Sequence, residues 1–287
     1  MPTIDAHHHF WDTTRFTYPW MGDELASIRR PFAPGDLHPL LAANAVEGTV
    51  LVQTRHDLDE TREFLAIAAA HAFVLGVVGW VDLTGPSVAE TIAALRSGPG
   101  GDKLVAIRHQ VHDEPDAEWL LRADVQRGLR QVAAAGLVYD LLVRTRELPA
   151  AIRVTRDIPA LRCVLDHLAK PPLVAGDLSN WSALLRELSR SDNVVAAKVS
   201  GLVTEADWQH WTVADLQPAV DVALETFGPE RLMFGSDWPV CLVAAAYDDV
   251  LRTARTLTGA LSDVEKDRVF SSTALAAYHL EKGDNAR

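Results

Sequence analysis

Short apolar runs rich in valine, isoleucine and leucine recur along the whole chain of 287 residues. Most of them are continuous rather than alternating, which is typical of strands that are buried on both faces of a parallel sheet. Eight strands are predicted, at Thr3–His7, Gly48–Gln53, Val74–Val81, Leu104–His109, Val138–Val143, Arg162–His167, Val195–Ser200 and Leu232–Ser236.

Segments rich in alanine and leucine, with the spacing of helices, separate most of these runs. They are Asp59–His71, Ser87–Arg96, Ala117–Ala135, Glu147–Arg156, Trp181–Ser189 and Gln217–Phe227. Strands that alternate with helices predict βαβ units and a parallel sheet. Eight repeats favour an α/β fold of the closed (β/α)8 TIM barrel type over an open sheet, and the chain is close to the roughly 250 residues typical of that barrel.

Two stretches lie outside this repeat. Residues 10–41 are expected to form a long first loop with a helix near Pro39–Asn44, and a final helical part, Ser262–Tyr278, follows the eighth strand. The chain contains no linker or break in composition, so residues 1–287 are expected to form a single domain.

Composition excludes several classes of partner. The net charge is −12, from 27 basic and 39 acidic residues without a basic stripe, so nucleic acid is not an expected partner. No apolar run is long enough to span a membrane, and no signal peptide is visible. The two cysteines, Cys163 and Cys241, are too few for a disulfide framework. A cytoplasmic protein is expected.

The first strand ends in two histidines, His7 and His9, that are two residues apart. Side chains two apart on a strand point to the same face, so both imidazoles should lie over one pocket at the mouth of the barrel. Imidazole is a common metal ligand and a ready general base. A tag remnant or a pair of buried structural histidines are the alternatives, and the residues at the other strand ends decide between them.

Two residues at later strand ends complete a convergent set. His167 closes the sixth strand, and Asp237 follows the eighth strand after a Gly-Ser pair. A carboxylate buried there without partners would be costly, which favours a functional role for Asp237. With His7 and His9, these residues suit either one divalent ion or a metal-free site that activates water by proton transfer.

Other residues at the strand ends are candidates for binding a substrate. Polar groups are offered by Gln53, Arg108, His109 and Lys198, and flat apolar walls by Trp11, Trp20 and Trp238. Each has a structural alternative. Lys198 could be an ion-pair partner inside the barrel, and Trp238 could simply pack. Asp140 is expected to anchor a neighbouring loop or to pair with an arginine, and His56 and His112 are expected to be loop residues.

Six motifs, spread in order over nearly the whole chain, resemble the amidohydrolase superfamily and, within it, the branch of sugar lactone hydrolases that includes L-fuconolactonase and L-rhamnonolactonase. The matching segments are Ile4–Trp11 with Tyr18–Trp20, Val52–Gln53, Ile107–His109, Val164–Pro171, Lys198–Leu202 and Phe234–Pro239. The resemblance implies a (β/α)8 barrel whose site uses His7, His9, His167 and Asp237.

One departure from the family's binuclear members concerns the metal. Those members bridge two ions with a carboxylated lysine or a glutamate on the fourth or fifth strand, where this chain has Arg108 and His109. The resemblance therefore implies one zinc-like ion, held by the four residues above, or no ion.

The resemblance implies hydrolysis of a sugar lactone to its aldonic acid, with Asp237 accepting a proton from the attacking water. In the absence of an ion, His167 and Arg108 would stabilise the developing oxyanion. Two alternatives stay open. One is another enzyme of the superfamily, either a metal-dependent decarboxylase or an amide hydrolase. The other is a non-catalytic barrel that binds sugars.

Overall fold

The computed structural model describes residues 3–281, which contain one sheet of eight parallel strands in the order β1 to β8. The strands are β1 Thr3–His8, β2 Val46–Val52, β3 Val74–Gly79, β4 Leu104–Gln110, β5 Val138–Leu142, β6 Cys163–Leu165, β7 Val194–Val199 and β8 Leu232–Phe234. All eight predicted strands are present, with ends that differ by a few residues, and the (β/α)8 barrel is confirmed.

The ring closes just beyond the end of β8. The backbone N–H of Asp237 donates to the carbonyl of His7 over 2.8 Å, and that of His9 donates to the carbonyl of Trp238 over 2.7 Å. His8 and Trp238 form a parallel bridge between the same segments. This closure places the segment around Asp237 directly beside the histidines of β1.

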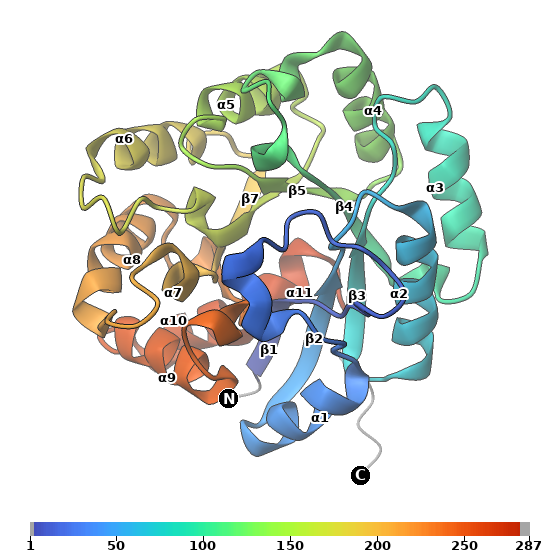
Figure 1. Cartoon of the computed structure of the whole chain (residues 1–287). Coiled ribbons are helices and arrows are strands. Elements are labelled where there is room, and N and C mark those ends of the chain that lie inside the picture. The colour runs from blue at the N-terminus through green and yellow to red at the C-terminus, as the bar shows by residue number, and fades with distance from the viewer. Residues whose placement is uncertain (1–2, 282–287) are drawn as a thin grey trace.

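Helices surround the ring of strands (Figure 1). They are α1 Pro34–Ala43, α2 Leu58–Ala70, α3 Val88–Ser97, α4 Ala123–Ala134, α5 Leu148–Asp157, α6 Ser179–Leu188, α7 Leu202–Glu205, α8 Val213–Phe227, α9 Tyr247–Leu257, α10 Asp263–Asp267 and α11 Thr273–Ala277. The six predicted helices correspond to α2–α6 and α8. None of the helices in the described part of the chain is long and apolar enough to cross a membrane.

Several helices differ from the prediction, and the short α7 was not predicted. The helix predicted at Ala117–Ala135 begins only at Ala123, because Trp119–Leu121 forms a 3-10 turn first. α1 begins at Pro34, whose fixed φ suits the first turn of a helix. α9 was not predicted. Its buried residues recur every three or four positions among charged ones, a helical pattern without the alanine and leucine runs of the other helices.

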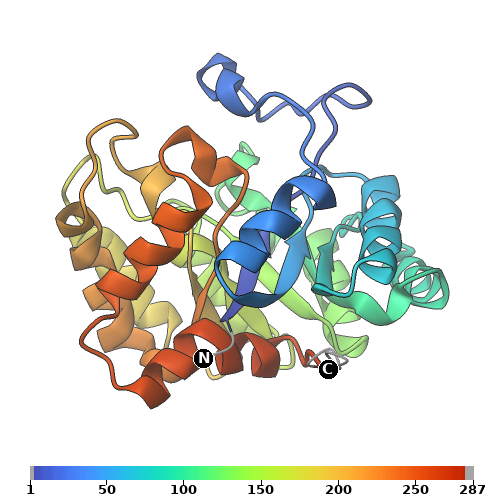
Figure 2. The same cartoon turned by 90° about the horizontal axis from the view of Figure 1, so that it is seen from below.

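The two ends of the barrel are covered by different segments. The long loop after β1 projects over the end where the strands finish, while the last helices, including α11, lie across the opposite end (Figure 2). Within that loop, Asp23–Ile28 form a 3-10 helix, and the indole of Trp11 donates to the carbonyl of Arg30 over 2.8 Å. The open face of the barrel thus lies under the N-terminal loop.

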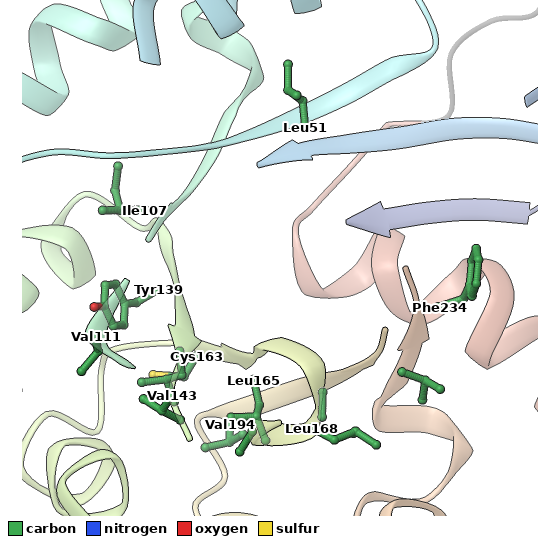
Figure 3. Packing of buried hydrophobic residues seen from close by; sticks show 14 of the residues in the cluster. Leu51, Ile107, Val111, Tyr139, Val143, Cys163, Leu165, Leu168, Val194 and Phe234 are labelled. Carbon is green, nitrogen blue, oxygen red and sulfur yellow. The ribbon is translucent and has the colours of Figure 1, made fainter. Parts of the chain in front are cut away.

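The apolar core has two shells. The larger one lies between the strands and the helices and includes Leu51, Ile107 and Phe234 (Figure 3). The smaller one fills the inside of the barrel and reaches α11. Its members on the strands are Ile4, Ala6, Val50, Val52, Leu75, Val78, Ala106, Val138, Val164, Ala196 and Met233.

A layer of charged side chains lies above this inner apolar shell. It consists of Arg108, Asp140, Asp166 and Lys198, each two residues beyond an inner apolar residue, so that strand alternation turns them inward as well. The Lys198 ammonium lies 2.7 Å from Asp140 and 2.8 Å from Asp166. Arg108 donates to Asp166 over 2.9 Å. Lys198 is therefore an ion-pair partner inside the barrel, which was one of its two predicted roles.

We predict that Lys198→Met lowers the free energy of unfolding by about 3–5 kcal/mol, because it leaves buried carboxylates without a counter-charge. The double variant Lys198→Met/Asp140→Asn should recover much of that loss. It removes both charges of the pair and keeps an acceptor for the Tyr278 hydroxyl, which lies 2.7 Å from Asp140. Urea denaturation measures both values. A double variant no more stable than the single one would contradict the pairing.

Candidate active site

A bulge in β1 turns His7 and His9 toward the same pocket. Asp5 pairs with Thr49 of β2 and His8 pairs with Leu51, so β1 has one more residue than its partner over this step. His8 then points to the other side, where its Nε2 lies 2.9 Å from the hydroxyl of Thr49. The outer two histidines of the triplet share a face, as the alternation predicted.

Three imidazoles lie around one oxygen of the Asp237 carboxylate. Asp237 Oδ1 lies 3.3 Å from His9 Nε2, 3.8 Å from His7 Nε2 and 4.0 Å from His167 Nε2. The two β1 rings are also in contact, with 3.2 Å between their Nε2 atoms. The structure thus brings together all four residues that the sequence singled out.

An unusual turn places His167. Residues 167–170 all have positive φ, between 50° and 59°, a left-handed region that non-glycine residues rarely occupy. The Trp181 indole of α6 holds this turn by donating to the carbonyl of Leu168 over 2.7 Å. His167 Nδ1 lies 2.8 Å from the Ser200 hydroxyl. At Gly201 a Cβ would lie only 2.7 Å from the same nitrogen, so the imidazole needs a glycine there.

Asp5 holds the two segments of the site together, and the sequence analysis did not select it. Its carboxylate accepts from the backbone N–H groups of Ser236 at 2.8 Å and His7 at 3.2 Å, and from the Tyr247 hydroxyl of α9 at 3.1 Å. Burial raises the pKa of Asp5 to about 6. The available signal was an acidic residue within an otherwise apolar strand, four positions before His9.

Burial keeps His7 and His167 neutral while Asp237 stays ionised. Burial and then the Lys198 charge lower the pKa of His7 well below its usual range, and burial lowers that of His167 to about 4. Burial alone would raise the pKa of Asp237. His167 and the hydrogen bond from His9 outweigh that effect, so its pKa falls below the usual value. At neutral pH the site therefore presents a carboxylate beside the uncharged imidazoles of His7 and His167.

The donor set fits one divalent ion. His7, His167 and Asp237 each offer one ligand atom, and these atoms lie within 4.8 Å of one another. Two imidazoles and one carboxylate, with room for water, form a common catalytic zinc set. His9 Nδ1 donates to the carbonyl of Val52 over 2.8 Å, which orients the ring so that its Nε2 faces Asp237 beside the set.

A second group of potential ligands, His56, His109 and Glu114, has a geometry that does not suit a metal. The two rings stack with 3.9 Å between centroids and 19° between planes, so their in-plane lone pairs are nearly parallel and do not converge on one ion close to both rings. His109 also stacks on Trp119 at 4.1 Å, and its Nε2 lies 2.8 Å from Glu114. This arrangement ties the loop after β4 together.

The cavity beside Asp237 has a volume of about 100 Å³. Its lining residues are His9, Trp20, Thr54, Arg108, Gln110, His112, Asp113, Leu142, His167, Lys170, Asp237 and Val240. Of the predicted substrate-binding residues, only Trp20 and Arg108 belong to it. Four lining residues that the sequence analysis did not select as binding residues, Gln110, His112, Asp113 and Lys170, follow the fourth and sixth strands closely, which was their signal in the sequence.

The other predicted substrate-binding residues lie elsewhere. Gln53 and Lys198 are fully buried in the charged layer, and His109 lies in the stack described above. Trp11 is anchored in the N-terminal loop, and Trp238 packs edge-on against Phe32 at 5.2 Å. The sequence located the strand ends correctly. Whether a residue there packs or lines the cavity depends on how deep it lies in the barrel and on the direction in which its side chain points.

Arg108 lines the cavity, but its N–H groups already donate hydrogen bonds to other residues of the protein. Its guanidinium donates to the side chain and backbone carbonyl of Gln53 and to Asp166, and its Nη1 lies 3.3 Å from His7 Nε2. These contacts account for the five N–H groups of the side chain. Arg108 therefore offers the cavity its charge and its contact with His7 rather than a free fork of donors.

The amidohydrolase family model matches residues 4–280, nearly the whole chain. The chain belongs to the amidohydrolase family. An L-fucono-1,5-lactonase from Burkholderia multivorans is 41% identical to this amidohydrolase over 295 residues, covering 99% of this chain and 98% of that protein. An L-rhamnono-gamma-lactonase from Scheffersomyces stipitis is 26% identical over 168 residues, half of each chain.

Two crystal structures of an amidohydrolase from Burkholderia multivorans, one with bound HEPES and one with bound zinc, share the fold of this amidohydrolase closely. They are 40% identical to it and superpose with TM-scores of 0.93 and 0.91, covering 98% of this chain and all of the other. The family and the barrel expected from the motifs are thus confirmed over nearly the full length.

The depressed histidine pKa values predict that stability falls as the pH drops below about 6.5. Burial lowers the pKa of His8 to about 3 and that of His167 to about 4, from 6.5 in the unfolded chain. The unfolded chain then takes up protons that the folded protein does not bind, which costs up to about 1.4 kcal/mol per pH unit for each histidine. Asp5 and Asp140, with pKa values raised to about 6, oppose this below pH 6. The histidines outnumber them: His7, His8, His109, His112 and His167 all have lowered pKa values.

Urea denaturation of chelator-treated protein between about pH 7 and pH 5 measures this slope. His8→Gln keeps a partner for the Thr49 hydroxyl and removes one titrating ring, so it should make the slope shallower by up to one proton. The exposed Gln209, which carries no titratable group, serves as the control, and Gln209→Leu should leave the slope unchanged. A free energy of unfolding that stays constant or rises toward pH 5 would contradict the prediction.

Proposed function

We propose that this amidohydrolase opens the ring of a sugar lactone by hydrolysis, giving the aldonic acid. The observation that carries the proposal is an ionised carboxylate, Asp237, surrounded by three histidines at the mouth of the barrel. The relatives named above as lactonases support the same reaction. The small-molecule lactone would enter through the cavity beside Asp237.

In the proposed reaction, Asp237 is the general base. A water between Asp237 and the lactone carbonyl gives a proton to the carboxylate as its oxygen attacks the carbonyl carbon. His9 Nε2, 3.3 Å from Asp237, helps to orient that water. When the tetrahedral intermediate collapses, the proton passes from Asp237 to the ring oxygen that leaves, and the products are the free acid and the regenerated carboxylate.

The negative charge that develops on the carbonyl oxygen of the lactone needs a hydrogen-bond donor to stabilise it. If the Ser200 hydroxyl donates to His167 Nδ1, the Nε2 of that ring carries the proton and faces the cavity. His167 is therefore assigned the oxyanion contact. Arg108 stabilises the same charge through its field, since its own N–H groups already bind Gln53, Asp166 and His7.

If an ion is bound, His7, His167 and Asp237 would hold it. A zinc-like ion there would lower the pKa of a bound water and polarise the lactone carbonyl.

We also propose a cytoplasmic location, and a single domain over residues 1–287. Cys163 and Cys241 are both free and buried, in keeping with a reducing compartment.

Asp237→Asn should lower kcat/KM for lactone hydrolysis by about 10²–10⁴-fold, because it removes the base while keeping the shape of the side chain. The measurement is a pH-indicator assay of acid release over a panel of sugar lactones. Asp102→Asn is the matched control. Asp102 is exposed in the turn Gly101–Lys103, just before β4 begins, and its replacement should retain full activity. A folded Asp237→Asn protein with near-normal turnover would make the base assignment wrong.

Zinc titration of metal-free protein should reveal one site per chain, and His167→Asn should weaken that binding by about tenfold or more. Calorimetry and elemental analysis give the stoichiometry, and acid release with and without added zinc shows whether hydrolysis depends on the ion. Equal zinc affinity in the wild type and in His167→Asn would exclude His167 as a ligand. Full turnover by verifiably metal-free protein would remove the Lewis-acid role.

A further inference from the structure

Two cavities adjoin at the mouth of the barrel. The catalytic cavity of about 100 Å³ is smaller than the roughly 300–1,000 Å³ usual for small-molecule sites. A second cavity of about 520 Å³ is lined by Thr17, Pro19, Trp20, Thr54, Arg55, His56, Asp57, Gln110, Asp113 and Glu114. Trp20, Thr54, Gln110 and Asp113 line both, so a ligand at Asp237 can extend past them into the second cavity.

Gln110 stands at the junction of the two cavities with its side-chain amide unused. It is the last residue of β4, and strand alternation turns it inward like Ala106 and Arg108. The residue is only 8% exposed, and among residues 3–281 its side-chain amide has no hydrogen-bond partner. The amide atoms do not belong to the fully buried unpaired polar atoms of residues 3–281, and Gln110 lines both cavities, so a ligand there can use the free hydrogen-bonding capacity of this amide.

The neighbouring residues suit a polyhydroxylated ligand. The indole of Trp20 is fixed by its hydrogen bond to the carbonyl of Thr54 at 3.0 Å and offers a flat face to the C–H groups of a sugar. Asp113 is exposed at the same junction and offers a carboxylate to hydroxyl donors. The only basic side chain among the lining residues of the second cavity, apart from His56, is Arg55, which pairs with Asp57. The surroundings therefore favour a neutral substituent over an anionic one.

We propose that Gln110 determines substrate specificity by hydrogen-bonding a hydroxyl group of the lactone, at the point where the neutral, hydroxylated side of the ring passes from the catalytic cavity into the second one. This proposal rests on the proposed lactone hydrolysis. Gln110 acts as both donor and acceptor to that hydroxyl, and Trp20 and Asp113 line the same junction. A lactone without the hydroxyl leaves the amide unpaired and is selected against.

The test compares Gln110→Leu with wild type on two substrates, L-fucono-1,5-lactone and the unsubstituted ring δ-valerolactone. Gln110→Leu should lower kcat/KM for L-fucono-1,5-lactone by about 10–100-fold, the range expected when one hydrogen bond to a substrate is lost. It should leave kcat/KM for δ-valerolactone within about twofold, because that ring has no hydroxyl for the amide to bind. Gln209→Leu, at an exposed loop position, is the control and should match wild type on both. Equal losses on both substrates would show that Gln110 acts structurally and would overturn the proposal.

A binding measurement separates this proposal from the proposed reaction. Calorimetry with the lactam analogue of L-fucono-1,5-lactone, which resists hydrolysis, should show binding to wild type that weakens about tenfold or more in Gln110→Leu. Single-deoxy lactams then identify the hydroxyl: the one that lacks it should bind wild type and Gln110→Leu equally. If wild type hydrolyses no lactone but this pattern holds, the proposed reaction is wrong and the role of Gln110 stands. If lactam binding is absent or does not depend on Gln110, the role of Gln110 is wrong.

Discussion

The charged layer inside the barrel is the constraint on which the active site depends. Buried charges persist only where they compensate one another, so Lys198, Arg108, Asp140 and Asp166 must keep their mutual contacts. The two cations that this pairing fixes lie on either side of His7: Lys198 is 3.1 Å from Nδ1 and Arg108 is 3.3 Å from Nε2. His7 is thus oriented from below by charge pairing, while the backbone hydrogen bond from Asp237 orients it from the side of β8. The four-residue site is held on a preformed base rather than on mobile loops.

Sequence patterns could predict the barrel and the four central residues because both follow from local rules. Continuous apolar runs mark buried parallel strands, and polar residues that interrupt their carboxyl ends must either pair or react. The same rules could not tell how deep in the barrel a given residue of a strand would lie. Lys198 and Gln110 are both inward-facing polar residues near the ends of strands, yet Lys198 is fully buried in the charged layer and Gln110 reaches both cavities. Which one meets a ligand depends on how far each strand extends relative to its neighbours, and that is set by register in the closed ring.

Other features depended on tertiary contacts that leave no trace in a single segment. The bulge in β1 exists only in its pairing with β2, so β1 alone does not reveal it. The left-handed turn at residues 167–170 contains no glycine that would have predicted it. That turn persists because Trp181 binds the carbonyl of Leu168 and because Gly201 leaves space for the His167 ring. The tryptophans were ambiguous for a related reason, since an aromatic residue near a strand end can face the cavity, as Trp20 does, or the packing behind it, as Trp238 does. Helix α9 was missed because its apolar residues are interspersed with charged ones.

The structure divides chemistry from recognition by depth. In the proposed reaction, the paired charges and the uncharged His7 and His167 below the mouth of the barrel leave Asp237 as the general base, whichever lactone is bound. Above it, residues from the β4 end and the N-terminal loop, such as Gln110, Asp113 and Trp20, form the junction with the larger cavity. Changes in these outer residues can alter the choice of substrate without disturbing the charge pairing beneath, whereas a change in the charged layer acts on His7 directly. Barrels of this type can therefore keep one hydrolytic centre while their loops adapt to different rings.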